Sequence, residues 1–401
     1  MGAGNHWLAR LGKFDLPART RPRVWVHAVS VGEVQAASPL VRALLAALPN
    51  HEIVMTTTTA TGAAAAGRAL GDAVVHLPMP FDLPGAVDRF LSRVEPGLVV
   101  ILETELWPNL LAACESRGVP VALVNARLSP RSWRAYARLP SLTREMLASL
   151  SLIAAQSAGD ASRFRALGAP ADRLQVVGNL KFDIKPPGGA IEAGEALRKR
   201  LGRARPTWIA ASTHEGEEAL VLEAHEQIRR RWPDALLLLV PRHPERFPAV
   251  AGLCRSQGLP LALRSAPTPA DGDAAVFLGD SMGEMFTFYA ASDVAYIGGS
   301  LVPTGGHNPL EPAAVGVPVL AGPHVFNFEA TYALLEQAGA LGRVPDVESL
   351  ATSVAALFDS PAERARRAAN ASAIIDDHGG ASQRVVDGLV ALLSHVAPQH
   401  P

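Results

Sequence analysis

The chain has 401 residues, of which 48% are hydrophobic and 19% charged, and its formal net charge is −1. This length accommodates two domains of ordinary size, and the balanced charge gives no indication of a nucleic-acid partner. Its two cysteines, Cys114 and Cys254, have no metal-ligand spacing and fit a reduced cytosolic compartment. The sequence contains neither the ~18 consecutive apolar residues of a membrane span nor a secretory signal in its first 22 residues.

Apolar runs alternate with helical patterns through the first half of the chain. The runs are nearly continuous in hydrophobic residues, which is typical of strands in a parallel sheet covered on both faces. We predict strands at 24–29, 53–57, 73–77, 98–102, 119–125 and 152–156. Helical patterns fill the gaps between them, for example at 34–48 and 106–117.

This alternation breaks at Lys185–Gly189, which reads KPPGG, and we predict a linker there because proline and glycine continue neither element. Strands are then predicted at 208–211, 235–240, 259–263, 275–278, 294–297 and 317–320, and only helices from 350 to 393. The expected α/β fold has two Rossmann-like domains with parallel sheets facing across a cleft. Their expected bounds are 1–184 and 185–401, with the terminal helices in the second domain.

The segment Gly305–Pro312, which reads GGHNPLEP, is the most informative motif. Gly305 and Gly306 allow close approach of the backbone to a ligand, Asn308 is a good helix N-cap, and Glu311 has the spacing of a capping-box acid. A helix start after a glycine-rich loop suits an anion, although the same pattern also fits a well-capped helix with no ligand. The preceding strand favours a ligand site, because open α/β sheets bind ligands at the carboxyl ends of their strands.

Two acidic motifs follow predicted strands in the first half. In His27–Glu33, which reads HAVSVGE, Gly32 allows close approach, and Ser30 with Glu33 matches a capping box. Glu33 at a strand end is also suited to take a proton from an attacking hydroxyl. Glu103 and Glu105 follow the strand at 98–102. They belong either to a catalytic site at the strand end or to a solvated loop in which Trp107 packs into the core.

Basic and hydroxyl side chains follow other strands. Arg131, Arg134 and Arg138 share helical spacing close after Arg127, so they form either a solvated face or a dock for an anionic head group. Three strand-end loops in the second half suit phosphate: the one at 305–312, the one with Ser212 and Thr213, and the one with Arg242 and His243.

Several signatures are absent from the sequence: the Walker sequence, a G-x-G-x-x-G after the first strand, a zinc HExxH and a G-x-S-x-G elbow. Asp271 and Asp273 have the D-x-D form of a metal site, but the turn-like stretch around them argues against one. We therefore predict neither a metal nor a cofactor.

These blocks, in this order, resemble the transferases of 3-deoxy-D-manno-octulosonic acid (Kdo) in lipopolysaccharide assembly. The resemblance covers about residues 24–340 and is specific because so many blocks keep their order. Besides the motifs above, it is carried by TTTTATG at Thr56–Gly62, GNLK at Gly178–Lys181 and GPHVFNF at Gly322–Phe328.

The resemblance implies a GT-B fold and transfer of Kdo from CMP-Kdo to a lipid A precursor. We expect this transfer to a hydroxyl of the acceptor to be inverting and metal-independent. The resemblance also implies Glu33 as the general base, with Glu103 or Glu105 also essential. It places the residues matching Ser212, Arg242, Asn308 and Glu311 in the CMP pocket. We also expect five further residues to bind the donor: Lys181, Thr213, His243, Gly305 and Gly306. The residues expected to bind the acceptor are Ser30, Gly32, Thr58, Arg127, Arg131 and Arg134.

Members of this family usually begin with an apolar membrane anchor, whereas residues 1–21 here hold few apolar side chains. We expect a protein on the cytoplasmic face of the bacterial inner membrane, either peripheral or anchored by a segment absent from this chain. The alternatives are another GT-B nucleotide-sugar enzyme, such as an epimerase or a different transferase, and a non-catalytic scaffold that binds anionic lipid.

Overall fold

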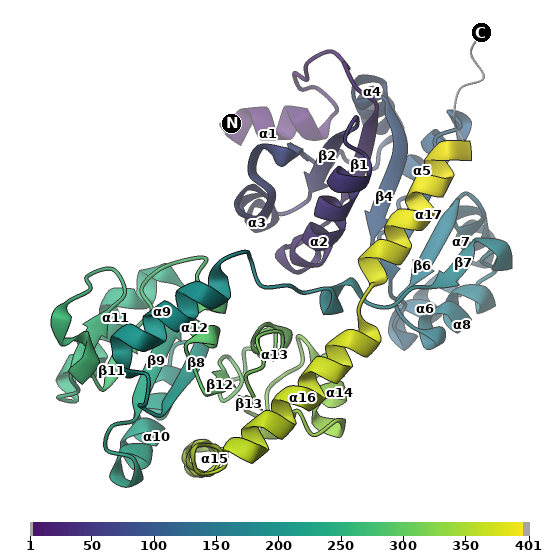
Figure 1. The fold of residues 1–401 in the computed structure, drawn as a ribbon. Helices are drawn as coiled ribbons and strands as arrows, with labels where there is room; N and C mark the ends of the chain where they lie inside the picture. The colour runs from purple at the N-terminus through teal and green to yellow at the C-terminus, as the bar shows by residue number, and fades with distance from the viewer. Residues whose placement is uncertain (1–2, 396–401) are drawn as a thin grey trace. The chain divides into compact units, whose positions relative to one another are not determined.

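The computed structural model describes residues 3–395, and the chain divides into two units. The first unit runs to Asp183 and includes the segment from His378 onward, and the second is Ile184–Asp377. Figure 1 shows that each unit has a central sheet with helices packed around it.

The sheet of the first unit has seven strands in the order β3-β2-β1-β4-β5-β6-β7, and all of its pairings are parallel. All six predicted strands are confirmed with small shifts of their ends. The seventh, at the sheet edge, has only three residues, which is too short for a clear hydrophobic pattern. The strands are β1 (Arg23–His27), β2 (Glu52–Thr57), β3 (Val75–Pro78), β4 (Pro96–Leu102), β5 (Val121–Ala126), β6 (Leu152–Ala155) and β7 (Leu174–Val176).

Helices cover both faces of this sheet and create two separate cores. One core lies under α2 (Val31–Ala47), α3 (Ala60–Leu70) and α17 (Ala381–His395). The other lies under α4 (Pro84–Val94), α5 (Pro108–Ser116), α7 (Pro140–Ala148) and α8 (Ala158–Ala166). Two further helices are α1 (Ala3–Arg10) and the short α6 (Pro130–Tyr136).

The second unit repeats the design with strand order β10-β11-β9-β8-β12-β13-β14. Its six predicted strands are confirmed, and β14 at the edge was missed. The strands are β8 (Thr207–Thr213), β9 (Leu236–Pro241), β10 (Leu261–Leu263), β11 (Val276–Leu278), β12 (Val294–Ile297), β13 (Val319–Ala321) and β14 (Leu341–Arg343). The helices are α9 (Ala190–Gly202), α10 (Glu217–Arg231), α11 (Phe247–Ser256), α12 (Met285–Ala290), α13 (Leu310–Ala313), α14 (Glu329–Gln337), α15 (Val347–Asp359) and α16 (Pro361–His378).

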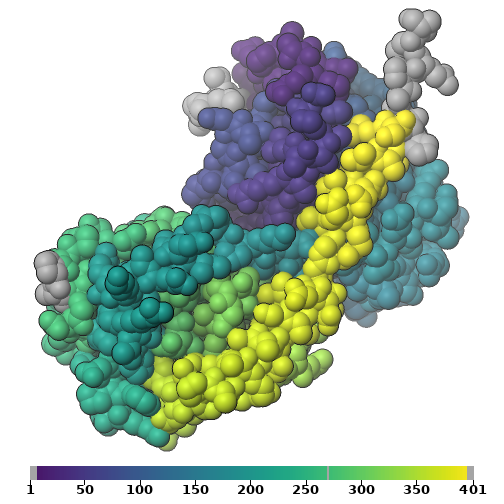
Figure 2. Space-filling view, viewed as in Figure 1, coloured from purple at the N-terminus to yellow at the C-terminus, as the bar shows by residue number. Residues whose placement is uncertain are grey.

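The last helix corrects the expected domain assignment, because α17 belongs to the first unit and not to the second. Its apolar stripe, including Val385 and Leu389, is buried in the core under α2. Asp183 receives the backbone N–H groups of Gly380, at 2.5 Å, and of Ser382, which satisfies amides at the helix start. Figure 2 shows α17 lying against α2 on the surface of the first unit.

No helix within the described part of the chain has both the length and the apolar character that crossing a bilayer requires.

Candidate functional site

In each unit, the residues of interest lie where parallel strands end, and the backbone is strained at these points. Glu103, Asn125 and Ser212 have φ values of 58°, 51° and 59°, in the left-handed region that most side chains avoid. They lie at the carboxyl ends of β4, β5 and β8, and at the latter two the strand register shifts. Such strain costs on the order of 1–3 kcal/mol per residue and concentrates at functional sites.

The capping box predicted at the start of α2 is only half formed: the Ser30 side chain accepts the Glu33 N–H at 3.5 Å, but the Glu33 carboxylate does not accept the Ser30 N–H. This carboxylate accepts hydrogen bonds from the backbone N–H of Val29 at 2.9 Å and the hydroxyl of Ser30 at 3.2 Å. The side chain is only 8% exposed. Burial raises the pKa of Glu33 to about 7, opposed by the bond from Val29 and reinforced by the negative charges of Glu103 and Glu105. A carboxyl group with this pKa exchanges a proton readily near neutral pH.

Glu103 and Glu105 complete a cluster of three carboxyl groups with Glu33. Burial, and then the charge of Glu103, raises the pKa of Glu105. The loop that carries them is tied down, because the Thr104 hydroxyl donates to the backbone oxygen of Arg127 and the Tyr136 hydroxyl donates to that of Thr104 at 3.2 Å. The cluster is therefore a fixed feature of the strand edge, with Trp107 packed on the core beside it.

The residues expected to bind the acceptor are found around this edge. Gly32 is exposed in the first turn of α2, and a side chain there would meet only the Ser30 hydroxyl, at 4.0 Å. Thr58 has a buried hydroxyl with no hydrogen-bond partner among the described residues. The side chains of Arg127, Arg131 and Arg134 are exposed and, within the described chain, have no ion-pair partner.

Two buried polar side chains at the same strand edge were not predicted as site residues. His27, at the end of β1, and Asn125 are both 0% exposed, yet His27 Nε2 and Asn125 Nδ2 have no partner within the described residues. The other ring nitrogen of His27 lies 2.9 Å from the Thr56 hydroxyl, and burial lowers the pKa of His27 to about 4. Unpaired buried polar atoms are costly, so a ligand or ordered water is their expected partner.

A buried glutamate missed by the sequence reasoning organises the edge of the second sheet. Glu217, at the start of α10, is 0% exposed. Its carboxylate accepts bonds from the Tyr296 hydroxyl at 2.6 Å and from four backbone N–H groups. These belong to Gly299 (2.6 Å), Ser300 and Leu301 (both 3.0 Å) and His214 (3.3 Å). Successive backbone N–H groups such as those in the turn after β12 can bind an anion, and here the Glu217 carboxylate occupies that position.

The loop at Gly305–Glu311 differs in part from the expectation. Gly305 has φ +99°, and a side chain there would approach Phe326 to 2.5 Å, so glycine is required. The N-cap of α13 is Pro309, one residue after the predicted Asn308, although the Asn308 side-chain oxygen accepts the Leu310 N–H at 3.1 Å. The capping role expected of Glu311 is wrong: its carboxylate makes no hydrogen bond within the described residues. Because α13 has only four residues, its dipole is also weaker than the sequence suggested.

The Glu311 carboxyl group is therefore free to meet a ligand. Burial raises its pKa to about 7, and the positive charge of Arg242 opposes this shift. The Arg242 loop is joined to the Ser212 loop through a backbone bond from the Arg242 N–H to the Thr213 oxygen at 3.0 Å. Thr213 itself is buried and donates its hydroxyl to Glu218 at 3.4 Å, so this hydroxyl, expected to bind phosphate, is engaged elsewhere.

Three histidines gather at this edge. The Nε2 atoms of His214 and His307 lie 2.8 Å apart, and the rings of His214 and His243 have centroids 5.4 Å apart. Burial, followed by the charge of Arg242, lowers the pKa of His307 to about 3, and burial also lowers that of His214. A hydrogen bond between these facing nitrogens requires one ring to donate and the other to accept.

Two further residues named by the sequence, Lys181 and Asp271, have their own surroundings. Lys181, expected to bind the donor, lies in the 3-10 turn Leu180–Phe182 of the first unit. Asp271 accepts bonds from the Thr268 N–H at 3.1 Å and hydroxyl at 2.9 Å, and faces Arg200 at 3.6 Å, so its role is structural. The described part of the chain contains no group of three or more side chains suited to hold a metal.

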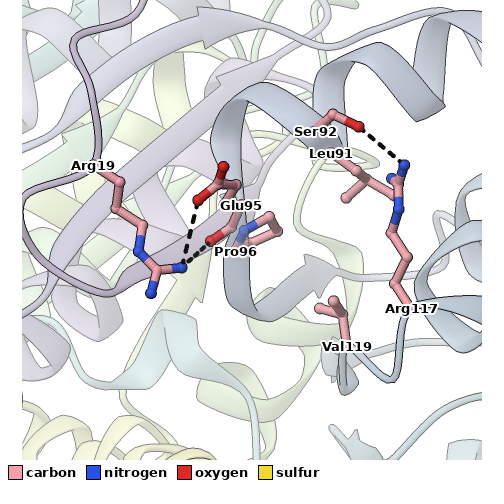
Figure 3. Close-up of a pocket in the computed structure, with 7 residues that line it drawn as sticks. All are labelled: Arg19, Leu91, Ser92, Glu95, Pro96, Arg117 and Val119. Carbon is pink, nitrogen blue, oxygen red and sulfur yellow. Dashed lines mark hydrogen bonds and ion pairs between the residues drawn. The ribbon is translucent and has the colours of Figure 1, made fainter. Parts of the chain in front are cut away.

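A hollow of about 410 Å³ lies at the amino ends of β4 and β5, the edge of the first sheet away from Glu33 (Figure 3). Its two arginines are already paired. Arg19 donates to the Glu95 backbone oxygen at 3.1 Å, and Arg117 pairs with Asp88 at 2.5 Å. None of the residues that line this hollow is among the candidate site residues named from the sequence.

Comparison with known proteins identifies the family. Residues 5–184 match the family described as 3-deoxy-D-manno-octulosonic-acid transferase (kdotransferase). A protein of that name from Haemophilus influenzae is 41% identical over 91% of this chain and 86% of its own length. Another, from Bordetella pertussis, is 42% identical over 96% of this chain and 92% of its own length.

Solved structures of similar fold include UDP-N-acetylglucosamine 2-epimerases. One matches with a TM-score of 0.62 at 17% identity, over 96% of this chain and 99% of that one. Another, from Neisseria meningitidis, matches with a TM-score of 0.60 at 14% identity, over 92% of this chain and all of that one. At these identities the likeness concerns the fold alone, which is of the GT-B type. The family match and the identity to the two transferases show that the chain belongs to the Kdo transferase family and is a glycosyltransferase.

Proposed function

We propose that this enzyme transfers Kdo from CMP-Kdo to a hydroxyl of a lipid A precursor in lipopolysaccharide biosynthesis, with inversion and without a metal. The observation that carries the proposal is the Glu33 carboxyl group, buried beside two other acids with a pKa of about 7. Its relatives are named for Kdo transfer. The lipid substrate further implies peripheral contact with the cytoplasmic face of the inner membrane.

Glu33 is the proposed general base. It takes the proton of the acceptor hydroxyl while that oxygen forms a bond to the anomeric carbon of Kdo. The bond from this carbon to the phosphate oxygen breaks, and CMP leaves with the electron pair. A single displacement inverts the configuration at the anomeric carbon. Burial, reinforced by the charges of Glu103 and Glu105, holds the pKa of Glu33 high, which makes its carboxylate a stronger base.

The donor is assigned to the strand edge of the second unit. Arg242 supplies a fixed positive charge for the phosphate, and the Ser212 and Gly305–Asn308 loops supply polar backbone groups beside it. Glu311, whose carboxylate has no hydrogen-bond partner within the described residues, is assigned to the ribose hydroxyls. Arg127, Arg131 and Arg134 are assigned to the phosphates of the acceptor.

The direct test replaces Glu33 with glutamine and measures turnover with CMP-Kdo and the lipid acceptor. General-base catalysis typically contributes about 10²–10⁴-fold, so a loss of tenfold or less would contradict this role. Neutralising Arg131 and Arg134 should raise the KM for the acceptor. A change confined to the donor KM would make that assignment wrong.

A second candidate is another GT-B nucleotide-sugar enzyme, because the fold also matches UDP-N-acetylglucosamine 2-epimerases. Direct binding of CMP and UDP separates the two, since the proposed transferase should prefer CMP. A non-catalytic lipid-binding scaffold would fail to turn over the donor. Mass spectrometry of the lipid product would identify the transfer and the number of Kdo residues added.

A further inference from the structure

Two neighbouring acids begin α10, and both of them are buried. Glu217 shapes the turn after β12, whereas Glu218 is 1% exposed and meets a different loop. The Glu218 carboxylate accepts hydrogen bonds from both Nε and Nη2 of Arg246, at 3.3 and 3.1 Å. This bidentate geometry is the strongest that an arginine forms with a carboxylate. Arg246 belongs to the loop after β9, which also carries Arg242.

The loop after β9 is fastened on both sides of Arg242. Before it turns, the Arg242 N–H donates to the Thr213 backbone oxygen at 3.0 Å. A 3-10 turn follows, in which the Arg246 N–H donates to the His243 oxygen at 3.0 Å, and the Arg246 side chain then meets Glu218. The short path between these two fastenings leaves the Arg242 backbone little freedom to move.

Both fastenings lead back to the Glu218 carboxylate. The Thr213 hydroxyl donates to Glu218 at 3.4 Å, on the same oxygen that Arg246 Nε contacts. Glu218 thus links the strand-end loops of β8 and β9 where the register between these strands shifts. The other contact of Arg246, from Nη1 to Glu215 at 3.5 Å, involves a side chain that is 88% exposed, and exposed ion pairs contribute little.

The Arg242 side chain, in contrast, is not committed to a partner. It is half-buried and makes no ion pair within the described residues. Burial raises the pKa of Glu311 and lowers that of His307, and the charge of Arg242 acts downward on both. Its guanidinium therefore lies near the loop that is assigned to the donor, while Arg246 is held on Glu218.

We propose that Glu218 and Arg246 are positioning residues, which fix the Arg242 loop so that its guanidinium meets the donor phosphate without rearrangement. Neither of the two touches the donor, and both act through Arg242. A cation that is already in place loses less conformational freedom when the donor binds, so the affinity is higher. Desolvation offsets most of the attraction within a buried ion pair, so added stability alone does not account for this one. The inference rests on the proposed function for the assignment of the phosphate to Arg242.

The test measures the binding of CMP, and of cytidine, which lacks the phosphate, to the whole protein by calorimetry. Arg246→Gln should weaken CMP binding by about tenfold, the effect of losing one hydrogen bond to a charged group, and leave cytidine binding unchanged. In a protein that already carries Arg242→Gln, the same substitution should cause no further loss, because residues that act through one another are not additive. Equal losses for CMP and cytidine, or a further loss in the absence of Arg242, overturn the proposal.

A second variant guards against poor folding. Arg246→Gln leaves the buried Glu218 carboxylate without its partner, which destabilises the protein. Glu218→Gln combined with Arg246→Gln removes both charges and leaves no carboxylate unpaired. This double variant should show the same loss of CMP affinity, and an affinity equal to that of wild type would contradict the proposal.

Arg198→Gln is the matched control in the same unit. Arg198 pairs with Asp293 at 2.7 Å, and its side chain is 16% exposed, close to the 23% of Arg246. This pair lies at the opposite edge of the sheet, because Asp293 precedes β12 and accepts the N–H of Thr207 at the start of β8. The control should lower the transition temperature and leave CMP affinity unchanged. A loss of CMP affinity equal to that of Arg246→Gln would show that any broken ion pair has this effect and would overturn the proposal.

This experiment separates failure of the inference from failure of the proposed function. An Arg246→Gln protein that binds CMP as tightly as wild type contradicts the inference alone. A wild-type protein that binds UDP in preference to CMP contradicts the proposed donor, and the same set of variants measured with UDP and uridine still tests the inference.

Discussion

Glu33→Gln should make the protein more stable at alkaline pH while removing its catalytic base. The carboxyl group of Glu33 has a pKa of about 7 in the folded chain and an ordinary value of 4.5. The folded state therefore binds this proton more tightly than the unfolded state does. The resulting stability is fully present below pH 4.5 and is lost as the pH rises through 7.

The size of the effect follows from the shift. Each pKa unit corresponds to 1.36 kcal/mol, so ionising Glu33 in the folded protein at pH 8 costs about 3 kcal/mol. Glutamine keeps an oxygen that can accept the Val29 N–H and carries no charge to desolvate. The variant should therefore gain up to about 3 kcal/mol of unfolding free energy at pH 8 and nothing at pH 4.

Calorimetry of wild type and variant at a series of pH values measures this difference. The transition temperature of the variant should exceed that of wild type by a margin that grows between pH 5 and pH 8. Glu115→Gln, an exposed glutamate of α5, is the control and should show no such margin. A margin independent of pH, or a variant that is less stable at pH 8, would refute the argument that the folded protein holds Glu33 in a costly ionised state.

Three other predictions concern the two strand edges. The pH profile of kcat/KM should rise near pH 7, where Glu33 loses its proton. In Glu105→Gln this rise should move to lower pH, because the variant lacks a negative charge that raises the pKa of Glu33. A profile that does not move would exclude Glu33 as the titrating base. Glu217→Gln should raise the KM for CMP-Kdo severalfold, because an amide group accepts fewer of the hydrogen bonds that shape the turn after β12. An unchanged KM for the donor would show that this turn does not position the donor. Removing divalent metals with a chelator should leave turnover intact, whereas an activity lost and then restored by added metal would contradict metal independence.

Local patterns in the sequence predicted most of the fold, because the buried strands of a parallel sheet carry a strong hydrophobic signal. The two strands that were missed, β7 and β14, have three residues each and lie at sheet edges, where little burial is imposed on the sequence. The Ser30 cap of α2 was also predictable, because its hydrogen bond from the Glu33 N–H joins residues within one helical turn.

Long-range contacts were not predictable in this way. The helical pattern of α17 predicted a helix, but not that its apolar stripe packs on α2 more than 300 positions earlier in the chain. No local pattern in the sequence distinguishes Glu217, because only the folded sheet brings the turn after β12 onto its carboxylate. Glu311 does not cap α13, because this helix has only four residues and three of them are buried, so packing decides where the Glu311 side chain lies.

The sequence by itself therefore determined all strands except β7 and β14, the order of the motifs and the family, since each depends on neighbouring residues or on their order alone. Only the tertiary structure decided which acids share a site and which are buried. The pKa of Glu33 depends on desolvation and on the charges of Glu103 and Glu105, which follow β4. The Glu311 carboxyl group is available to a ligand because the folded chain buries it without placing a hydrogen-bond partner beside it among the described residues. Desolvation and charge act through distance in space, which a linear pattern does not encode.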